Sequence, residues 1–151
     1  MKLKQWQKNL LSILVIVVGG FILFNLAFIL TALVVRATML VMKVPENMPP
    51  PYIGRYITLA LILIISYMVF RSHLNHTIKA TFLTMPLMVI LVMIGISLYG
   101  QAQWVIYGVG ALVIIAVILY LYKKKLPWLY YFATFYVAAL GVYIMISGMD
   151  I

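Results

Sequence analysis

The sequence predicts an all-α integral membrane protein, built as a single bundle of five transmembrane helices. The chain has no charged residue between Lys8 and Arg36, and none between Lys79 and Lys123. Its residues are 67% hydrophobic and only 9% charged, whereas soluble domains carry about 25% charged residues. A membrane-spanning helix needs about 20 predominantly apolar residues, and several stretches of this chain meet that requirement.

The first predicted span covers residues 10–35 and follows a short basic segment. Its apolar stretch is far longer than the roughly 7–15 residues of a secretory signal core, so we expect an uncleaved helix. At about 39 Å, this helix would exceed the hydrocarbon thickness and must tilt or overhang the bilayer. Gly19 and Gly20 mark the expected position of a bend.

The second span is predicted at residues 52–72, after a break at 43–51 that contains three consecutive prolines. The charge-free core of this span would be only about 22 Å long as a helix. We therefore expect Arg55 and Arg71, at its two ends, to extend their side chains to the bilayer surface. A re-entrant segment here, leaving four spans in all, is the alternative.

The third and fourth spans share one long charge-free stretch. Residues 80–122 would form a single helix of about 64 Å, twice the thickness of the hydrocarbon core. The chain must therefore reverse, and the polar segment 100–103 is the predicted turn. This places the third span at 81–99 and the fourth at 104–122.

A fifth span is predicted at residues 127–147. The three lysines 123–125 end the preceding apolar stretch. Pro127 follows them and suits the first turn of a new helix, where its missing N–H costs nothing.

The distribution of basic residues predicts the orientation. Eight of the 11 lysines and arginines fall on the side that the N-terminus shares with the connector 71–79 and the cluster 123–125. Cytoplasmic loops carry such an excess, so we predict a cell-membrane protein with a cytoplasmic N-terminus and an external C-terminus. The same count favours five spans over four. Because these charges lie at span ends, the net charge of +9 does not indicate a nucleic-acid partner.

Carboxylates are almost absent from the chain. Glu46 and Asp150 are the only acidic residues, and both lie outside the predicted spans. Acid–base catalysis, proton relays and hard-metal sites depend on such groups, so we expect no catalytic residue, no cofactor and no metal site. With no cysteine, disulfides and zinc–sulfur sites are excluded.

Two other residue types can bind metals. His73 and His76 would share a face if their connector were helical, and pairs of methionines favour Cu(I). Two histidines alone do not make a tight site, and methionine is an ordinary filler of apolar interiors. We interpret both sets as interface and packing residues.

Polar residues within the spans are candidates for solute contact or interhelical hydrogen bonds. Asn25 lies near the middle of the first span, where its amide needs a partner. We expect a bond to another helix. The candidate partners, which could also line a solute path, are Ser66, Thr84 and Ser97.

Two further sets of residues predict contact surfaces. Arginines at span ends can hold phosphate groups through two hydrogen bonds, so anionic headgroups are candidate ligands of Arg36, Arg55 and Arg71. Small residues on one helix face allow another helix to approach closely. In the fifth span such a face is formed by Thr134, Ala138, Gly141 and Gly148.

The resulting functional hypothesis is a non-catalytic accessory or binding component of a membrane complex. Its partners would be the lipid bilayer and a protein partner or a second copy, docked through small-residue faces. The alternative is a small oligomeric transporter or channel for a solute or ion, and a lipid-modifying membrane enzyme is third. A polar path lined by Asn25 would indicate transport, whereas a packed interior with an apolar or small-residue outer face would indicate a binding component.

Overall fold

The computed structural model describes residues 4–43, 52–98 and 100–146, with side chains through Ile144, and over these ranges it contains five α-helices and no strand. The predicted all-α class is therefore confirmed for this part of the chain. Each predicted span coincides with one helix, although α1 extends past both ends of its predicted range and α3 begins at His76 rather than at residue 81. The helices are α1 (Gln5–Val41), α2 (Tyr52–Arg71), α3 (His76–Ser97), α4 (Gln103–Lys123) and α5 (Trp128–Ile146).

The length and composition of the helices give the protein a membrane character. Helices α1 to α4 are each long and apolar enough to cross a membrane. The apolar α5 is the shortest of the five, with 19 residues. Helix α2 is a single unbroken helix of 20 residues.

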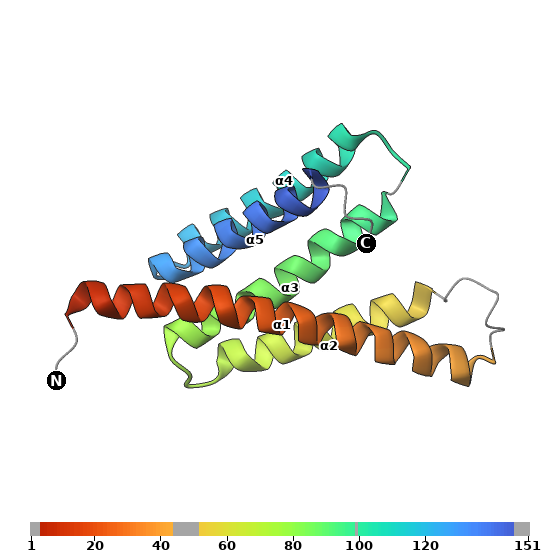
Figure 1. Ribbon diagram of the computed structural model, residues 1–151, viewed down its shortest axis with the longest axis horizontal. Coiled ribbons are helices and arrows are strands. Elements are labelled where there is room, and N and C mark those ends of the chain that lie inside the picture. The colour runs from red at the N-terminus through yellow and green to blue at the C-terminus, as the bar shows by residue number, and fades with distance from the viewer. Residues whose placement is uncertain (1–3, 44–51, 99, 147–151) are drawn as a thin grey trace.

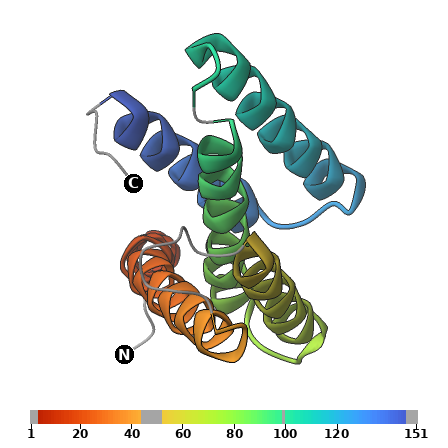
Figure 2. The same ribbon diagram turned by 90° about the vertical axis from the view of Figure 1, so that its right-hand side faces the viewer.

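Helix α3 occupies the centre of the molecule. Viewed along the helices, α1 and α2 lie on one side of α3, and α4 and α5 lie on the other (Figure 2). The central helix contacts each of the other four, whereas α2 makes no close backbone contact with α4 or α5 within the described ranges. The central position of α3 explains why it contributes to every cluster of buried apolar residues.

Successive helices run in opposite directions. The start of α1, the α2–α3 connection and the α4–α5 connection lie toward one end of the molecule (Figure 1). The last described turns of α1, α3 and α5 lie toward the other end. The described connections α2–α3 and α4–α5 therefore lie toward the same end of the molecule as the start of α1.

Local backbone geometry stops α4 and redirects the chain. Lys125 adopts a left-handed conformation with φ of 50°, and the Leu126 N–H then donates to the Leu121 carbonyl at 3.2 Å. This pattern satisfies a carbonyl that the helix end would otherwise leave without a partner. Pro127 follows, and its carbonyl accepts from the Tyr130 N–H at 3.1 Å as α5 begins.

Three groups of buried apolar side chains hold the bundle together. The first group joins α1, α3, α4 and α5 near the α4–α5 connection and contains Ile16, Ala80, Leu121, Tyr130 and Ala133. The second joins α1, α2 and α3 through Ala27, Ile62 and Met85. The third joins α3 and α5 through Leu87, Met88 and Val137. Met85 and Met88 therefore pack in separate groups, as expected of methionines that fill an apolar interior.

Glycines bring α1 close to its neighbours. A Cβ at Gly19 would lie 2.8 Å from Thr81 Cγ2, and one at Gly20 would lie 3.1 Å from Thr84 Oγ1. Helix α1 continues through both glycines, and Figure 1 shows no sharp kink there. The expected bend is thus replaced by a close crossing of α1 and α3, because the missing side chains are used for approach rather than for flexibility.

Candidate functional site

Asn25 does not form the interhelical bond that its position in the sequence suggested. Its side chain is exposed, and Nδ2 donates to the Phe21 carbonyl one turn earlier, at 2.8 Å. Ala27, which is buried against α2 and α3, lies two positions further on and about 200° around the helix. Asn25 must therefore point away from the bundle, so the expected bond was wrong.

The three proposed partners of Asn25 do not converge. Thr84 is fully buried, and its hydroxyl donates to the Thr81 carbonyl at 2.6 Å. Ser66 is buried on α2, and its Oγ is the one buried side-chain oxygen or nitrogen without a hydrogen-bond partner in the described ranges. Ser97 is exposed in the last turn of α3. These residues do not form a polar path with Asn25.

Other buried hydroxyls bond within their own helices. Thr58 donates to the Gly54 carbonyl at 2.9 Å, and Thr134 donates to the Tyr130 carbonyl at 2.9 Å. Such back-bonding satisfies a hydroxyl in apolar surroundings without help from another helix. The buried hydroxyls thus serve packing and are not arranged as a row of groups facing a channel.

Among the hydrogen bonds between helices, two join α1 to another helix, and neither was predicted from the sequence. Ser12 Oγ lies 3.1 Å from Thr77 Oγ1, which joins the early part of α1 to the first turn of α3. The Tyr136 hydroxyl donates to the Val17 carbonyl at 3.2 Å and joins α5 to α1. The sequence does not distinguish these residues from other serines, threonines and tyrosines of the chain, so the pairs are recognised only from their positions in space.

The histidines differ from the shared-face expectation. His73 lies in the non-helical connection between α2 and α3, whereas His76 begins α3. Nδ1 of His76 lies 3.3 Å from the Tyr130 hydroxyl, so His76 links the start of α3 to α5. Within the described ranges, no three His, Asp or Glu residues are grouped closely enough to hold a metal ion.

The arginines occupy three different settings. Arg36 is exposed on α1. The guanidinium of Arg55 lies 5.7 Å from the centre of the Tyr52 ring, a cation–π arrangement at the start of α2. Arg71 is exposed at the end of α2 and lines a groove between α2 and α4.

The small-residue face of α5 is divided between the core and an apolar hollow. Thr134 is fully buried, whereas Ala138 and Gly141 line the hollow that α5 forms with α3 and α4. Gly148, the fourth member of the predicted face, lies outside the described residues. The described part of this face therefore contributes one residue to internal packing and two residues to the wall of the hollow.

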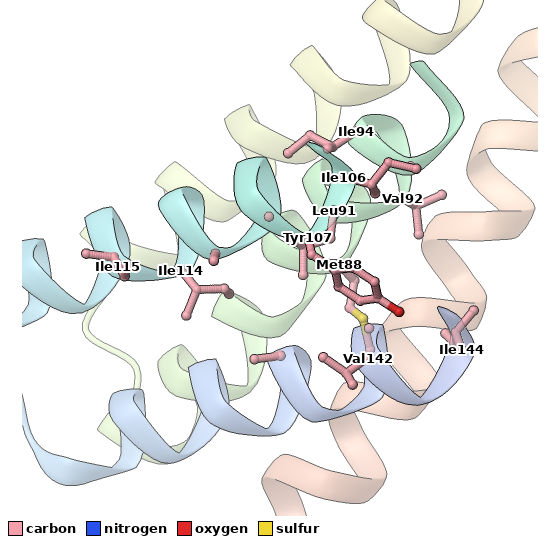
Figure 3. A pocket seen from close by; sticks show the side chains of 15 residues that line it. Met88, Leu91, Val92, Ile94, Ile106, Tyr107, Ile114, Ile115, Val142 and Ile144 are labelled. Carbon is pink, nitrogen blue, oxygen red and sulfur yellow. The ribbon is translucent and has the colours of Figure 1, made fainter. Parts of the chain in front are cut away.

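The hollow has a volume of about 420 Å³ and opens to the outside of the bundle. Its walls are apolar except at Tyr107, and Figure 3 shows Met88 and Tyr107 between α4 and α5. Three glycines contribute to it, namely Gly95, Gly110 and Gly141. The other lining residues are Met88, Leu91, Val92, Ile94, Ile106, Tyr107, Ala111, Ile114, Ile115, Ala138, Val142 and Ile144.

The hollow lies beside a part of α4 that contains no buried residue. Leu121, near its C-terminal end, is the one buried residue of α4, all of whose residues are described. Glycines on α3 and α4 add no side chain to the walls of the hollow. A Cβ at Gly95 would meet no atom within 4 Å, and one at Gly110 would first meet Leu91 at 3.7 Å. The space beside these glycines is therefore open to side chains from outside.

Sequence reasoning identified only part of this hollow. Two of its lining residues, Ala138 and Gly141, belong to the predicted small-residue face. The lining residues on α3 and α4 could not be identified from the sequence. Both helices are apolar around their whole circumference, so no pattern shows which face borders the hollow. Comparison with protein-family models, curated proteins and solved structures gave no match, so the functional argument depends on this geometry.

Proposed function

We propose that the protein is a five-span integral protein of the cell membrane with a cytoplasmic N-terminus and an external C-terminus. In this proposal α5 is the fifth span. The alternating helix directions in Figure 1 support it. The sequence supports it as well, because eight of the 11 basic residues fall in the N-terminal segment, the connector 71–79 and the cluster 123–125. Arg36, Lys43 and Arg55 then face the external side, where fewer positive charges are expected.

We further propose that it acts as a non-catalytic binding component of a membrane complex. The observation that carries this proposal is the apolar hollow of about 420 Å³ between α3, α4 and α5. Its occupant is a transmembrane helix of a partner protein. Small residues along the walls favour a helix as the occupant, because they allow two backbones to approach closely.

The arrangement of polar groups gives less support to a transporter. Asn25 points outward, and the buried threonines Thr58, Thr84 and Thr134 bond to carbonyls of their own helices. Enzymatic chemistry on lipid also lacks support in the described ranges. They contain no acidic residue, because Glu46 and Asp150 both lie outside them.

Site-specific photocross-linking tests the proposed docking surface. A photoreactive amino acid at Val142, which lines the hollow and is 45% exposed, should yield one discrete protein adduct in native membranes. The same group at Phe28, which is 57% exposed on α1, is the matched control. The mass of the adduct distinguishes a partner from a second copy. Protein adducts of equal yield at both positions, or none at Val142, would disprove the proposal.

A further inference from the structure

A second concave surface lies between α2 and α4, toward the end of the molecule opposite the hollow. It has a volume of about 690 Å³. Helices α2 and α4 make no close backbone contact within the described ranges, so α3 forms the floor between them and contributes Leu83. We refer to this surface as the α2–α4 groove.

The two walls of the α2–α4 groove carry the same pattern of side chains. On α2, Tyr67 is followed four residues later by Arg71, and on α4, Tyr120 is followed four residues later by Lys124. Residues four apart lie on the same face of a helix. Each wall therefore presents a tyrosine and, one turn nearer to the helix end, a cation.

Below these pairs the groove is apolar. The α4 wall continues through Ala116, Val117 and Leu121, and Phe70 adds an aromatic ring from α2. A ligand that fits has a negatively charged head beside the cations and a hydrocarbon part beneath it. A soluble anion satisfies only the first of these requirements.

The cations have no carboxylate partner within the described ranges, which contain no acidic residue. A neighbouring cation also satisfies the helix end near Arg71, since Lys79 Nζ donates to the Phe70 carbonyl at 3.0 Å. The guanidinium of Arg71 is thus not needed to cap that carbonyl. Arginine can hold a phosphate through two parallel hydrogen bonds, and lysine adds a point charge.

We propose that the α2–α4 groove binds one anionic phospholipid, with its phosphate between Arg71 and Lys124 and an acyl chain along Ala116 and Val117. The site is separate from the hollow between α3, α4 and α5 that serves the proposed function. In the proposed orientation its charged end faces the cytoplasmic leaflet, where anionic lipids attract basic residues.

Lipid retention measured by native mass spectrometry tests this site. The full-length protein is reconstituted in phosphatidylcholine bilayers that contain phosphatidylglycerol, then released in mild detergent. Wild type should retain one phosphatidylglycerol in preference to phosphatidylcholine. The double variant R71Q/K124Q should lose this preference by about tenfold, since each basic residue near the surface contributes measurably to anionic lipid binding.

The matched control removes the same charge from the same end of the molecule. Lys8 and Lys123 are exposed and do not line the groove, so K8Q/K123Q should keep most of the preference. Equal losses in the two double variants would overturn the proposal, because they would show attraction to net charge alone. Equal retention of both lipids by wild type would overturn it as well.

A third variant tests the apolar part of the groove. Ala116 is exposed on α4, so A116W should fill the groove without disturbing the core while leaving both cations in place. It should also lower phosphatidylglycerol retention. Displacement of the lipid by inorganic phosphate at matched ionic strength would contradict a lipid site and indicate a site for soluble anions.

Discussion

At the scale of single residues, four of the polar side chains that lie within the apolar stretches bond inside their own helices. Asn25, Thr58, Thr84 and Thr134 all bond to carbonyls of their own helices. The sequence identified the polar residues that lie within the predicted spans. It did not show whether each side chain faces another helix or the outside of the bundle. That direction depends on which helix face meets a neighbour, and α1 is apolar on every side.

Asn25→Leu should therefore leave the stability of the protein unchanged or raise it. The substitution removes an outward-facing amide that bonds only to the Phe21 carbonyl within α1. Thermal unfolding in detergent measures this effect. A loss of about 0.6–1.7 kcal/mol, the usual range for an interhelical bond, would show that Asn25 has a partner on another helix.

Gly54→Ala should destabilise the contact between α2 and α1. A Cβ at Gly54 would lie 2.8 Å from Thr38 Oγ1 and 3.2 Å from the Val35 Cα, which is a backbone atom and cannot rotate away. Overpacking of this kind typically costs about 1–3 kcal/mol, and thermal unfolding measures it.

Gly95→Ala is the control for this substitution. It adds the same methyl group within a helix, but a Cβ at Gly95 meets nothing within 4 Å. Because alanine favours helix over glycine, the control should unfold at the same temperature or higher. Equal behaviour of the two variants would contradict the close approach of α2 to α1.

At the scale of the elements, the boundaries of α2, α4 and α5 were predicted closely, those of α1 and α3 less so, and the neighbours of each helix were not predicted. Charges, prolines and the polar turn at 100–103 mark where apolar stretches end, and α2 and α4 begin and end close to the predicted positions. The sequence contains no comparable signal for which helices pack against one another. Helices without a polar face give no signal of which side is buried, so the central position of α3 required the structure.

A disulfide between α1 and α3 would test that central position. The side-chain oxygens of Ser12 and Thr77 lie 3.1 Å apart, so the variant S12C/T77C should cross-link on mild oxidation. The natural chain has no cysteine, so no other disulfide within the chain competes. Mobility on a non-reducing gel after protease cleavage between the two positions reports the bond.

The control pair is S12C/S97C, because Thr77 and Ser97 lie toward opposite ends of α3. This pair should remain reduced under the same conditions. Efficient cross-linking of the control pair, or no cross-linking of S12C/T77C, would contradict the packing of α1 against α3.

At the scale of the whole molecule, composition and charge distribution predicted the class of protein but only part of the candidate site. The apolar hollow lies beside residues 106–115 of α4, a stretch without a buried residue. No pattern in the α4 sequence marks this stretch as exposed, because α4 is apolar around its whole circumference. Arg71, which lines the α2–α4 groove, was singled out from the sequence as a candidate headgroup contact, whereas Lys124, which also lines it, was not.

Topology is the first prediction at this scale. Reporter fusions after residues 75 and 125 should be active only as cytoplasmic reporters, and a fusion at the C-terminus only as an external one. The physical reason is the excess of basic residues, eight against three, in the segments expected on the cytoplasmic side. A cytoplasmic C-terminus would mean that the chain crosses the membrane an even number of times.

The central claim is that the hollow between α3, α4 and α5 holds a partner helix, and one pair of variants tests it most directly. Gly110 lines the hollow, whereas Gly108 on the same helix does not and is exposed. A Cβ at either position lies at least 3.7 Å from its neighbours, so Gly110→Leu and Gly108→Leu should both fold.

The measurement is the mass of the complex extracted from native membranes in mild detergent. We expect wild type and Gly108→Leu to migrate as the same complex, and Gly110→Leu to appear as the free protomer because leucine occupies the space of the docked helix. A complex of unchanged mass and yield in Gly110→Leu would contradict the proposed docking surface.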